Sequence, residues 1–160
     1  MFSHGVCLFI KVYNCCRMEV KIVSKFAHSF PVYVTDYNSG MDVFAFIKQK
    51  IVLKPLKRVL VPTGSYIELP EGFEAQIRPR SGLAVKHGLK ILNTPGTMDA
   101  DYRGEIQVIL VNLSSKNCNI KDGDRICQMV ISRHEKIRWK LVQELNDTVQ
   151  GSGGFGHTGI

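Results

Sequence analysis

Residues 105–113, EIQVILVNL, decide the fold class of this chain. Apolar side chains fill nearly every position of the segment, so neither of its faces suits water. Aliphatic and β-branched residues in such a run favour a strand, and a strand that is apolar on both faces must be covered twice. Either a second sheet of the same chain or a second subunit can supply the cover, and the pattern alone leaves both open.

Alternation of apolar and polar residues dominates the rest of the chain, whereas helical spacing is almost absent. Turn residues such as Gly, Pro, Asn and Asp separate the alternating segments. Strands are expected at residues 19–24, 31–35, 41–47, 57–62, 65–69, 73–78, 105–113, 125–132 and 137–144. A single helical turn is expected at 83–87. Many short strands at this spacing predict an all-β sandwich, jelly roll or barrel.

The length of 160 residues, 44% of them hydrophobic, predicts one domain with short appendages. Strand-like alternation begins directly after Met18, so residues 1–17 are expected to be a disordered extension or to follow from a misassigned start. The β domain is expected to span 18–145. Residues 146–160 are rich in Gly and lack periodicity, which predicts a flexible arm.

The charge of the chain points to an anionic partner. Lys and Arg number 21 against 14 Asp and Glu, a formal net charge of +7. These cations are spread along the sequence and form no block, which favours a small polyphosphate over nucleic acid.

The cysteines and the N-terminal residues bear on localisation. Five cysteines without a Cys-x-x-Cys pair predict a reduced, cytoplasmic protein with neither a disulfide framework nor a zinc site. The apolar stretch at 5–10 is too short to span a bilayer and lacks a signal-peptide cleavage site, so no membrane association is expected.

Residues 80–82, RSG, are the first candidate for chemistry. A guanidinium, a hydroxyl and a permissive backbone at the start of a helical turn suit phosphate oxygens. Such tripeptides are also common in turns, so by itself this segment is explained better by a purely structural role.

Residues 93–104 are expected to form a strand, a tight hairpin bend and a return into the buried strand. A hairpin backbone can read the edge of a pyrimidine, and Asp99 could orient and deprotonate a water molecule. Asp101 is explained as a turn residue that hydrogen-bonds its own backbone. Tyr102 fits either core packing or a platform under a sugar.

Residues 123–129, GDRICQM, begin as a turn and continue as a strand. Gln128 lies on a face with apolar residues, so it needs either a buried protein partner or a ligand phosphate. Asp124 and Arg125 are expected to pair with each other or with neighbours.

Five segments, in this order and spacing, resemble the five motifs of the trimeric all-β deoxyuridine triphosphatases (dUTPases). They are SGMDV (39–43), RPRSGLA (78–84), GTMDADYRG (96–104), GDRICQM (123–129) and GSGGFG (151–156). The resemblance covers about residues 30–160. It implies an all-β distorted jelly roll or β-clip barrel, assembled as a homotrimer with the C-terminal arm exchanged between subunits.

The resemblance also implies the activity: hydrolysis of dUTP to dUMP and pyrophosphate, which limits uracil in DNA and supplies dUMP for dTMP synthesis. Asp99 would hold the water that attacks the α-phosphorus. The other implied substrate-binding residues are Arg80, Ser81, Gly82 and Gln128 for the phosphates; Asn93, Thr97 and Met98 for uracil; Tyr102 for the deoxyribose; and Gln150, Phe155 and Gly156 on the closing arm. Asp42 would help to hold the hydration shell of the Mg²⁺ cofactor.

One position departs from the family pattern. An Arg usually precedes the first Gly of the fifth motif and contacts the γ-phosphate, but this chain has Gln150. A neutral amide forfeits a charge-assisted hydrogen bond of roughly 1.5 to 3 kcal/mol. The departure keeps open a weakened nucleotide-binding or regulatory module.

Two other enzyme classes fit the residues poorly. The related deoxycytidine triphosphate deaminases share the fold but need a glutamate where Ile109 stands. A zinc deaminase would need a His-x-Glu and a Pro-Cys-x-x-Cys, and the sequence has neither.

Overall fold

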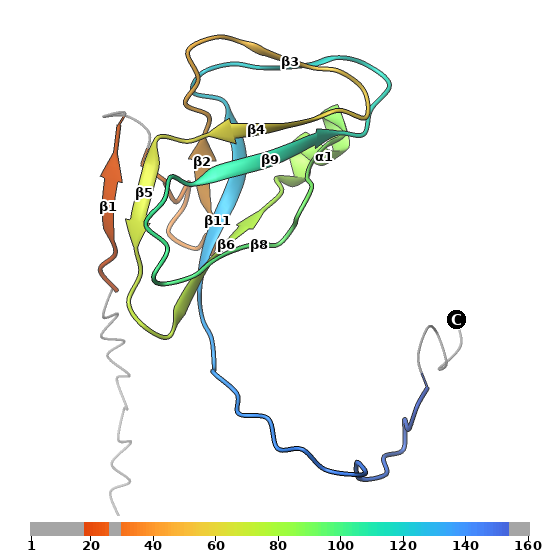
Figure 1. Cartoon of the computed structure of the whole chain (residues 1–160). Coiled ribbons are helices and arrows are strands. Elements are labelled where there is room, and N and C mark those ends of the chain that lie inside the picture. Colours follow the sequence, from red (N-terminus) through yellow and green to blue (C-terminus); the bar gives the residue numbers. More distant parts are fainter. Residues whose placement is uncertain (1–17, 26–29, 154–160) are drawn as a thin grey trace, which may run out of the picture.

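The computed structural model describes residues 18–25 and 30–153, and nearly all of its regular structure is β (Figure 1). The strands are β1 Lys21–Ser24, β2 Met41–Phe44, β3 Ile51–Leu53, β4 Arg58–Pro62, β5 Ser65–Glu68, β6 Phe73–Arg78, β7 Leu89–Ile91, β8 Gly96–Met98, β9 Gln107–Asn112, β10 Cys118–Ile120 and β11 Arg125–Arg133. The described residues contain one helix, α1, at Ser81–His87. The chain is therefore mostly β, as the sequence predicts.

Antiparallel ladders join the strands into two larger sheets, with the orders β2-β11-β6-β8 and β4-β9-β7. Two strand pairs, β1-β5 and β3-β10, add to them. Buried side chains from all four groups form a single apolar core, which includes Val43, Leu53, Ile67, Ile77 and Leu110. Removal of this apolar surface from water is the main force that holds the sheets together.

Segment 105–113 contains β9, the central strand of its sheet, between β4 and β7. Val108 and Leu110 face the core and are each 1% exposed. On the other face Ile109 is half-buried, and Leu60, its partner on β4, is 52% exposed. One face of this doubly apolar strand is thus covered within the chain, while the other is left partly open.

Two predicted strands are wrong. In 31–35 only Val32 forms a bridge, to Asp42, because the chain then turns and the Asn38 amide donates to the Thr35 carbonyl. Segment 137–144 forms no strand, since no described strand of this chain lies beside it to share a ladder.

Other differences concern short elements. The sequence gives no sign of β3, β7 or β10, because three residues are too few to show a period-2 pattern. The helix begins at Ser81, two residues before the expected turn.

The hairpin predicted at 93–104 is not a paired hairpin. β8 pairs with β6 in one sheet, whereas β9 pairs with β4 and β7 in the other. A tight turn joins them, in which the Tyr102 amide donates to the Asp99 carbonyl at 3.1 Å. This turn carries the chain from one sheet to the other and presents its side chains at that crossing.

After β11 the chain runs away from the domain without regular secondary structure as far as residue 153 (Figure 1). Trp139 and Leu141 in this segment are 88% and 98% exposed. The last strand ends at Arg133, and the boundary predicted at 145 stays a prediction. Residues 1–17, Phe155 and Gly156 lie outside the described part of the chain.

Candidate active site

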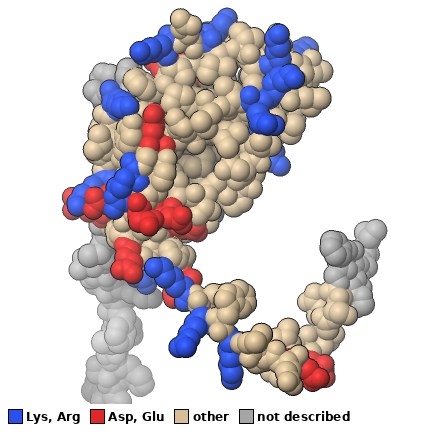
Figure 2. All heavy atoms as spheres, in the orientation of Figure 1, with Lys and Arg blue, Asp and Glu red and all other residues tan. Residues whose placement is uncertain are grey.

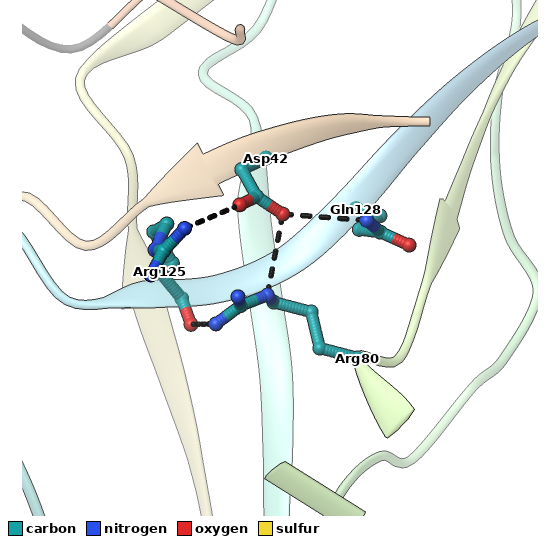
Figure 3. A network of polar contacts seen from close by, with 4 residues as sticks. All are labelled: Asp42, Arg80, Arg125 and Gln128. Atoms are coloured by element: carbon teal, nitrogen blue, oxygen red, sulfur yellow. Dashed lines mark hydrogen bonds and ion pairs between the residues drawn. The ribbon is translucent and has the colours of Figure 1, made fainter. Parts of the chain in front are cut away.

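Asp42 on β2 is the centre of a first group of predicted site residues (Figure 3). Its side chain is 2% exposed, and both carboxylate oxygens have partners. Arg125 Nη1 donates to Oδ2 at 3.1 Å, Arg80 Nε lies 3.2 Å from Oδ1, and Gln128 Nε2 donates to Oδ1 at a longer 3.4 Å. Two positive charges surround one negative charge, so a net positive charge remains beside Gln128.

A β-bulge in β11 explains how Arg125 and Gln128 reach the same carboxylate. Side chains three residues apart in a regular strand point to opposite faces of the sheet. The pairing of β11 with β2 shifts between Arg125 and Cys127, and Gln128 then lies opposite Asp42. The bulge therefore turns both side chains to one face, as bulges near active sites often do.

Of the two alternatives expected for Asp124 and Arg125, the mutual pair is wrong, because Arg125 pairs with Asp42 across the sheet and not with Asp124. Asp124 accepts a hydrogen bond from the Lys121 amide at 2.7 Å. Nothing in the sequence pattern marks the contact between Arg125 and Asp42, because a β-bulge decides which face of the sheet the Arg125 side chain takes.

Arg80 leads into α1, and its side chain is tied back to the sheet because Nη1 donates to the Arg125 carbonyl at 3.0 Å. Ser81 and Gly82 form the exposed first turn of the helix. A Cβ at Gly82 would meet nothing within 4 Å, so packing inside this chain does not require glycine there.

The far end of α1 does require glycine. Gly88 has φ 61°, and a Cβ there would lie 2.8 Å from the Ser114 amide nitrogen. The left-handed cap ends the helix and fixes α1 against the loop after β9.

A second group of predicted site residues lines a pocket of about 280 Å³ at the turn between β8 and β9. It contains Asn93, Thr97, Met98, Asp99 and Tyr102. The Asp99 side chain is exposed, and among the described residues it has no hydrogen bond or ion pair. The pocket thus presents an unpaired carboxylate beside an amide, an aromatic ring and backbone polar groups.

Tyr102 is held firmly at the edge of this pocket. Its hydroxyl donates to the Glu105 carbonyl at 3.0 Å, and a Cβ at Gly104 would collide with that hydroxyl. Arg103, which the sequence analysis missed, donates from Nη1 to the carbonyls of Ala100 and Tyr102. The turn is braced from both sides, so the ring lies in a fixed position.

The predicted site residues do not form one site within the chain. None of the residues grouped around Asp42 lines the pocket that contains Asp99. Gln150 lies farther away in the extended segment, where its amide donates to the Gly153 carbonyl at 3.1 Å.

Thiol chemistry is excluded at the strand that carries Gln128. Cys127 is fully buried, and burial raises the pKa of its thiol to about 12. The thiol stays protonated at neutral pH and is a poor nucleophile.

Comparison with known proteins gives the family. A sequence profile described as dUTPase matches residues 28–159. The chain belongs to the dUTPase family. It is similar to the deoxyuridine 5'-triphosphate nucleotidohydrolase of Finegoldia magna, with 52% identity over 89% of this chain and 99% of that protein. The enzyme of the same name from Cytophaga hutchinsonii is 56% identical over 88% of this chain and 92% of its own length.

Solved structures agree on the dUTPase fold. A mutant dUTPase of Staphylococcus bacteriophage 80alpha with dUpNHpp matches with a TM-score of 0.76 and 22% identity, over 89% of this chain and 99% of that chain. A dUTPase mutant from phage phi11 of S. aureus, described with a structural Mg(II) ion, matches with a TM-score of 0.72 and 20% identity. The match covers 81% of this chain and 100% of that chain.

The residues of this dUTPase fit a magnesium ligand set poorly as they are placed. Among residues 18–25 and 30–153, no three His, Cys, Asp or Glu side chains gather in a cluster that could hold a metal ion by itself. Mg²⁺ needs oxygen ligands with free lone pairs in near-octahedral geometry. Asp42 is the implied carboxylate, but it is buried and already bonded to Arg80, Arg125 and Gln128.

Proposed function

We propose that this chain hydrolyses dUTP to dUMP and pyrophosphate. The observation that carries the proposal is the unpaired carboxylate of Asp99 beside Asn93 and Tyr102, in a chain of the dUTPase family. Support also comes from relatives that are named for this reaction and are 52% and 56% identical over nearly the whole chain.

Asp99 is the proposed general base. Its exposed carboxylate accepts a proton from a water molecule as the water oxygen attacks the α-phosphorus. The bond from this phosphorus to the oxygen shared with the β-phosphorus breaks, and pyrophosphate leaves. The strongly braced turn favours this role, because a base must be held in reach of its water.

The phosphate chain is proposed to lie on the other group. Arg80, Ser81, Gly82 and Gln128 are the proposed donors, and the net positive charge around Asp42 attracts the anion. The open space at Gly82 supports a close approach of phosphate to the backbone there. We expect the triphosphate to arrive as its Mg²⁺ complex, in which phosphate oxygens and water hold the ion.

Base and sugar selection are assigned to the pocket. Asn93 and the backbone of Thr97 and Met98 would pair with uracil and leave no room for the methyl group of thymine. Tyr102, locked by its hydroxyl contact to Glu105, would lie under the deoxyribose and exclude a 2′-hydroxyl.

We also propose a homotrimer in which each site is shared. The separation of the Asp42 group from the Asp99 pocket supports this, because the two must meet around one substrate. The partly open apolar face around Leu60 and Ile109 supports it too, since a second subunit would cover that face.

Exchange of the C-terminal segment completes the proposed assembly. Ile137, Trp139 and Leu141 alternate with Arg138 and Lys140, a strand pattern without a strand partner in this chain. Pairing with an open strand edge of a neighbouring subunit would bury these side chains. Residues 146–160, with Gln150, Phe155 and Gly156, would then close over the nucleotide in a neighbour's site.

A nucleotide panel tests the activity. Purified protein with Mg²⁺ is incubated with dUTP, dTTP, dCTP and UTP, and pyrophosphate release is measured. Release from dUTP alone is expected. Binding of dUTP without turnover would instead support the regulatory module and contradict the proposed reaction.

Mixed oligomers test the shared site. Asp99→Asn and Arg80→Ala subunits, each inactive alone, are unfolded together and refolded. Recovery of activity is expected, because some sites then receive an intact part from each subunit. Persistent inactivity of a mixture that refolds to trimers would contradict sharing, and the trimer itself is checked by light scattering.

A further inference from the structure

The group around Asp42 suggests a division of labour within the proposed reaction. Resting on the proposed function, we propose that Asp42 is a positioning residue that presets Arg80 and Gln128 for the triphosphate, without contacting the magnesium hydration shell. Arg125 is the second positioning residue, because it anchors Asp42 from the other side.

The occupancy of the carboxylate is the first argument. Asp42 is 2% exposed, and three donors converge on it: Arg125 and Gln128 from β11, and Arg80 from the start of α1 (Figure 3). A buried carboxylate is stable only with such compensation. The three donors use three of the roughly four lone-pair sites of the carboxylate, and its burial leaves metal-bound water little access to the remaining site on Oδ2.

The backbone provides the second argument. Asp42 exchanges two hydrogen bonds with Val32, at 2.8 and 3.2 Å, and lies opposite Gln128 in the ladder on its other side. The strand is fixed from both edges, and the bulge in β11 places Arg125 on the same face. A carboxylate this constrained is suited to fixing other side chains.

Arg125 and Arg80 provide the third argument. The Arg80 side chain is 24% exposed and that of Arg125 49% exposed, so their guanidinium groups remain partly in water. Arg80 contacts both the Asp42 carboxylate and the Arg125 carbonyl, which leaves its position little freedom. Without Asp42 the two guanidinium groups would repel each other and separate.

The role predicts an effect on phosphate binding that does not depend on magnesium. The probe is the α,β-imido analogue of dUTP, with binding measured by calorimetry in EDTA and again in Mg²⁺. Asp42→Asn is expected to weaken binding about tenfold in both, the equivalent of one charge-assisted contact. The Mg²⁺ concentration for half-maximal activity should not change, while KM for dUTP rises.

Arg125 gives an independent test if Asp42→Asn does not fold. Arg125→Gln should weaken analogue binding several-fold in EDTA, and Arg125→Lys, which keeps the charge, should restore part of it. Glu71→Gln is the matched control, because this carboxylate is 92% exposed and bonded only weakly to Lys136, at 3.9 Å.

The inference is overturned if Asp42→Asn or Arg125→Gln binds the analogue in EDTA like the unmodified chain. A loss confined to Mg²⁺ would place Asp42 on the metal. Failure of the unmodified chain to release pyrophosphate from dUTP would contradict the proposed function instead, so the two failures are distinguishable.

Discussion

Asp42 and Asp99 are two carboxylates of the same predicted site in opposite environments. Asp42 is buried in a sheet and bonded to three side chains, whereas Asp99 is exposed in a turn and has no side-chain partner among the described residues. Burial and full bonding suit a group that holds others in place. An unpaired, accessible carboxylate suits a group that takes a proton.

The surroundings of the two carboxylates also differ: those of Asp42 hold its carboxylate in place, whereas those of Asp99 hold only the backbone. Around Asp42, two strands and a bulge fix the donors before any ligand arrives. Around Asp99, the contacts brace the backbone of the turn through Arg103 and leave the carboxylate itself free. The fold thus separates the rigid support from the reactive group, and each can be tested by the same Asp→Asn change.

The largest expected effect is on catalysis, from Asp99→Asn. Loss of the general base should lower kcat about 10²- to 10⁴-fold while dUTP binding is preserved, because the amide keeps the shape but not the basicity. Steady-state kinetics and calorimetry measure the two quantities. Asp101→Asn, in the same exposed turn, is the control and should stay active. An active Asp99→Asn enzyme would remove Asp99 from the proposed role.

The next effect is on stability, from Asp42→Asn. Removing the charge leaves the partly exposed Arg80 and Arg125 without their shared partner and should destabilise the folded chain by about 1 to 3 kcal/mol, whereas Asp99→Asn should leave stability nearly unchanged. Urea unfolding at one fixed protein concentration measures both. Equal stabilities for the two variants would erase the distinction between the carboxylates.

A smaller effect is expected on substrate affinity, from Gln150→Arg. The guanidinium would add a charge-assisted contact to the γ-phosphate and lower KM for dUTP about tenfold. Gln150→Lys is the control for charge alone and should give less, because it lacks the planar fork. If neither KM nor kcat responds to Gln150→Arg, this position does not reach the phosphate.

Much of the fold follows from local pattern. Long alternating strands such as β6 and β11 were predicted nearly to the residue, since their period-2 signal spans six or more positions. The three-residue strands have no period to read. Segment 137–144 has the alternation of a strand but forms none in this chain. A strand needs the edge of a neighbouring strand to pair with, and local alternation does not show whether such an edge is present.

The site shows the same limit. Gln128 could be marked from sequence as a residue that needs a partner, but Arg125 could not, because a bulge decides which face it takes. The Asp99 turn was placed correctly, yet its neighbours belong to two different sheets. Pairing across the sheet is a property of the assembled chain and leaves little trace in local spacing.

Glu68 is a third carboxylate, which is bonded but not buried, so it separates the effect of bonding from that of burial. Its replacement is expected to have the smallest effect on stability. It is bonded to Lys21 at 3.0 Å on the exposed β1-β5 pair, and this contact holds the pKa of Glu68 below its ordinary value of 4.5. A carboxylate whose pKa is lower in the folded chain than in the unfolded chain stabilises the fold at pH values above its unfolded pKa. This stabilisation is lost as the pH falls through the pKa of the folded chain. An exposed ion pair is strongly screened by water, however.

Glu68→Gln should therefore give the same urea midpoint as the unmodified chain at pH 7, and any small difference should fade as pH falls through the lowered pKa of Glu68 in the folded chain. Lys21→Gln, which breaks the same pair from the other side, is the matched control and should behave alike. If Glu68→Gln lowered stability at pH 7 as much as Asp42→Asn does, a bonded partner, and not burial, would determine how much a carboxylate stabilises this fold. The contrast between Asp42 and Asp99 would then have to be explained by partners alone.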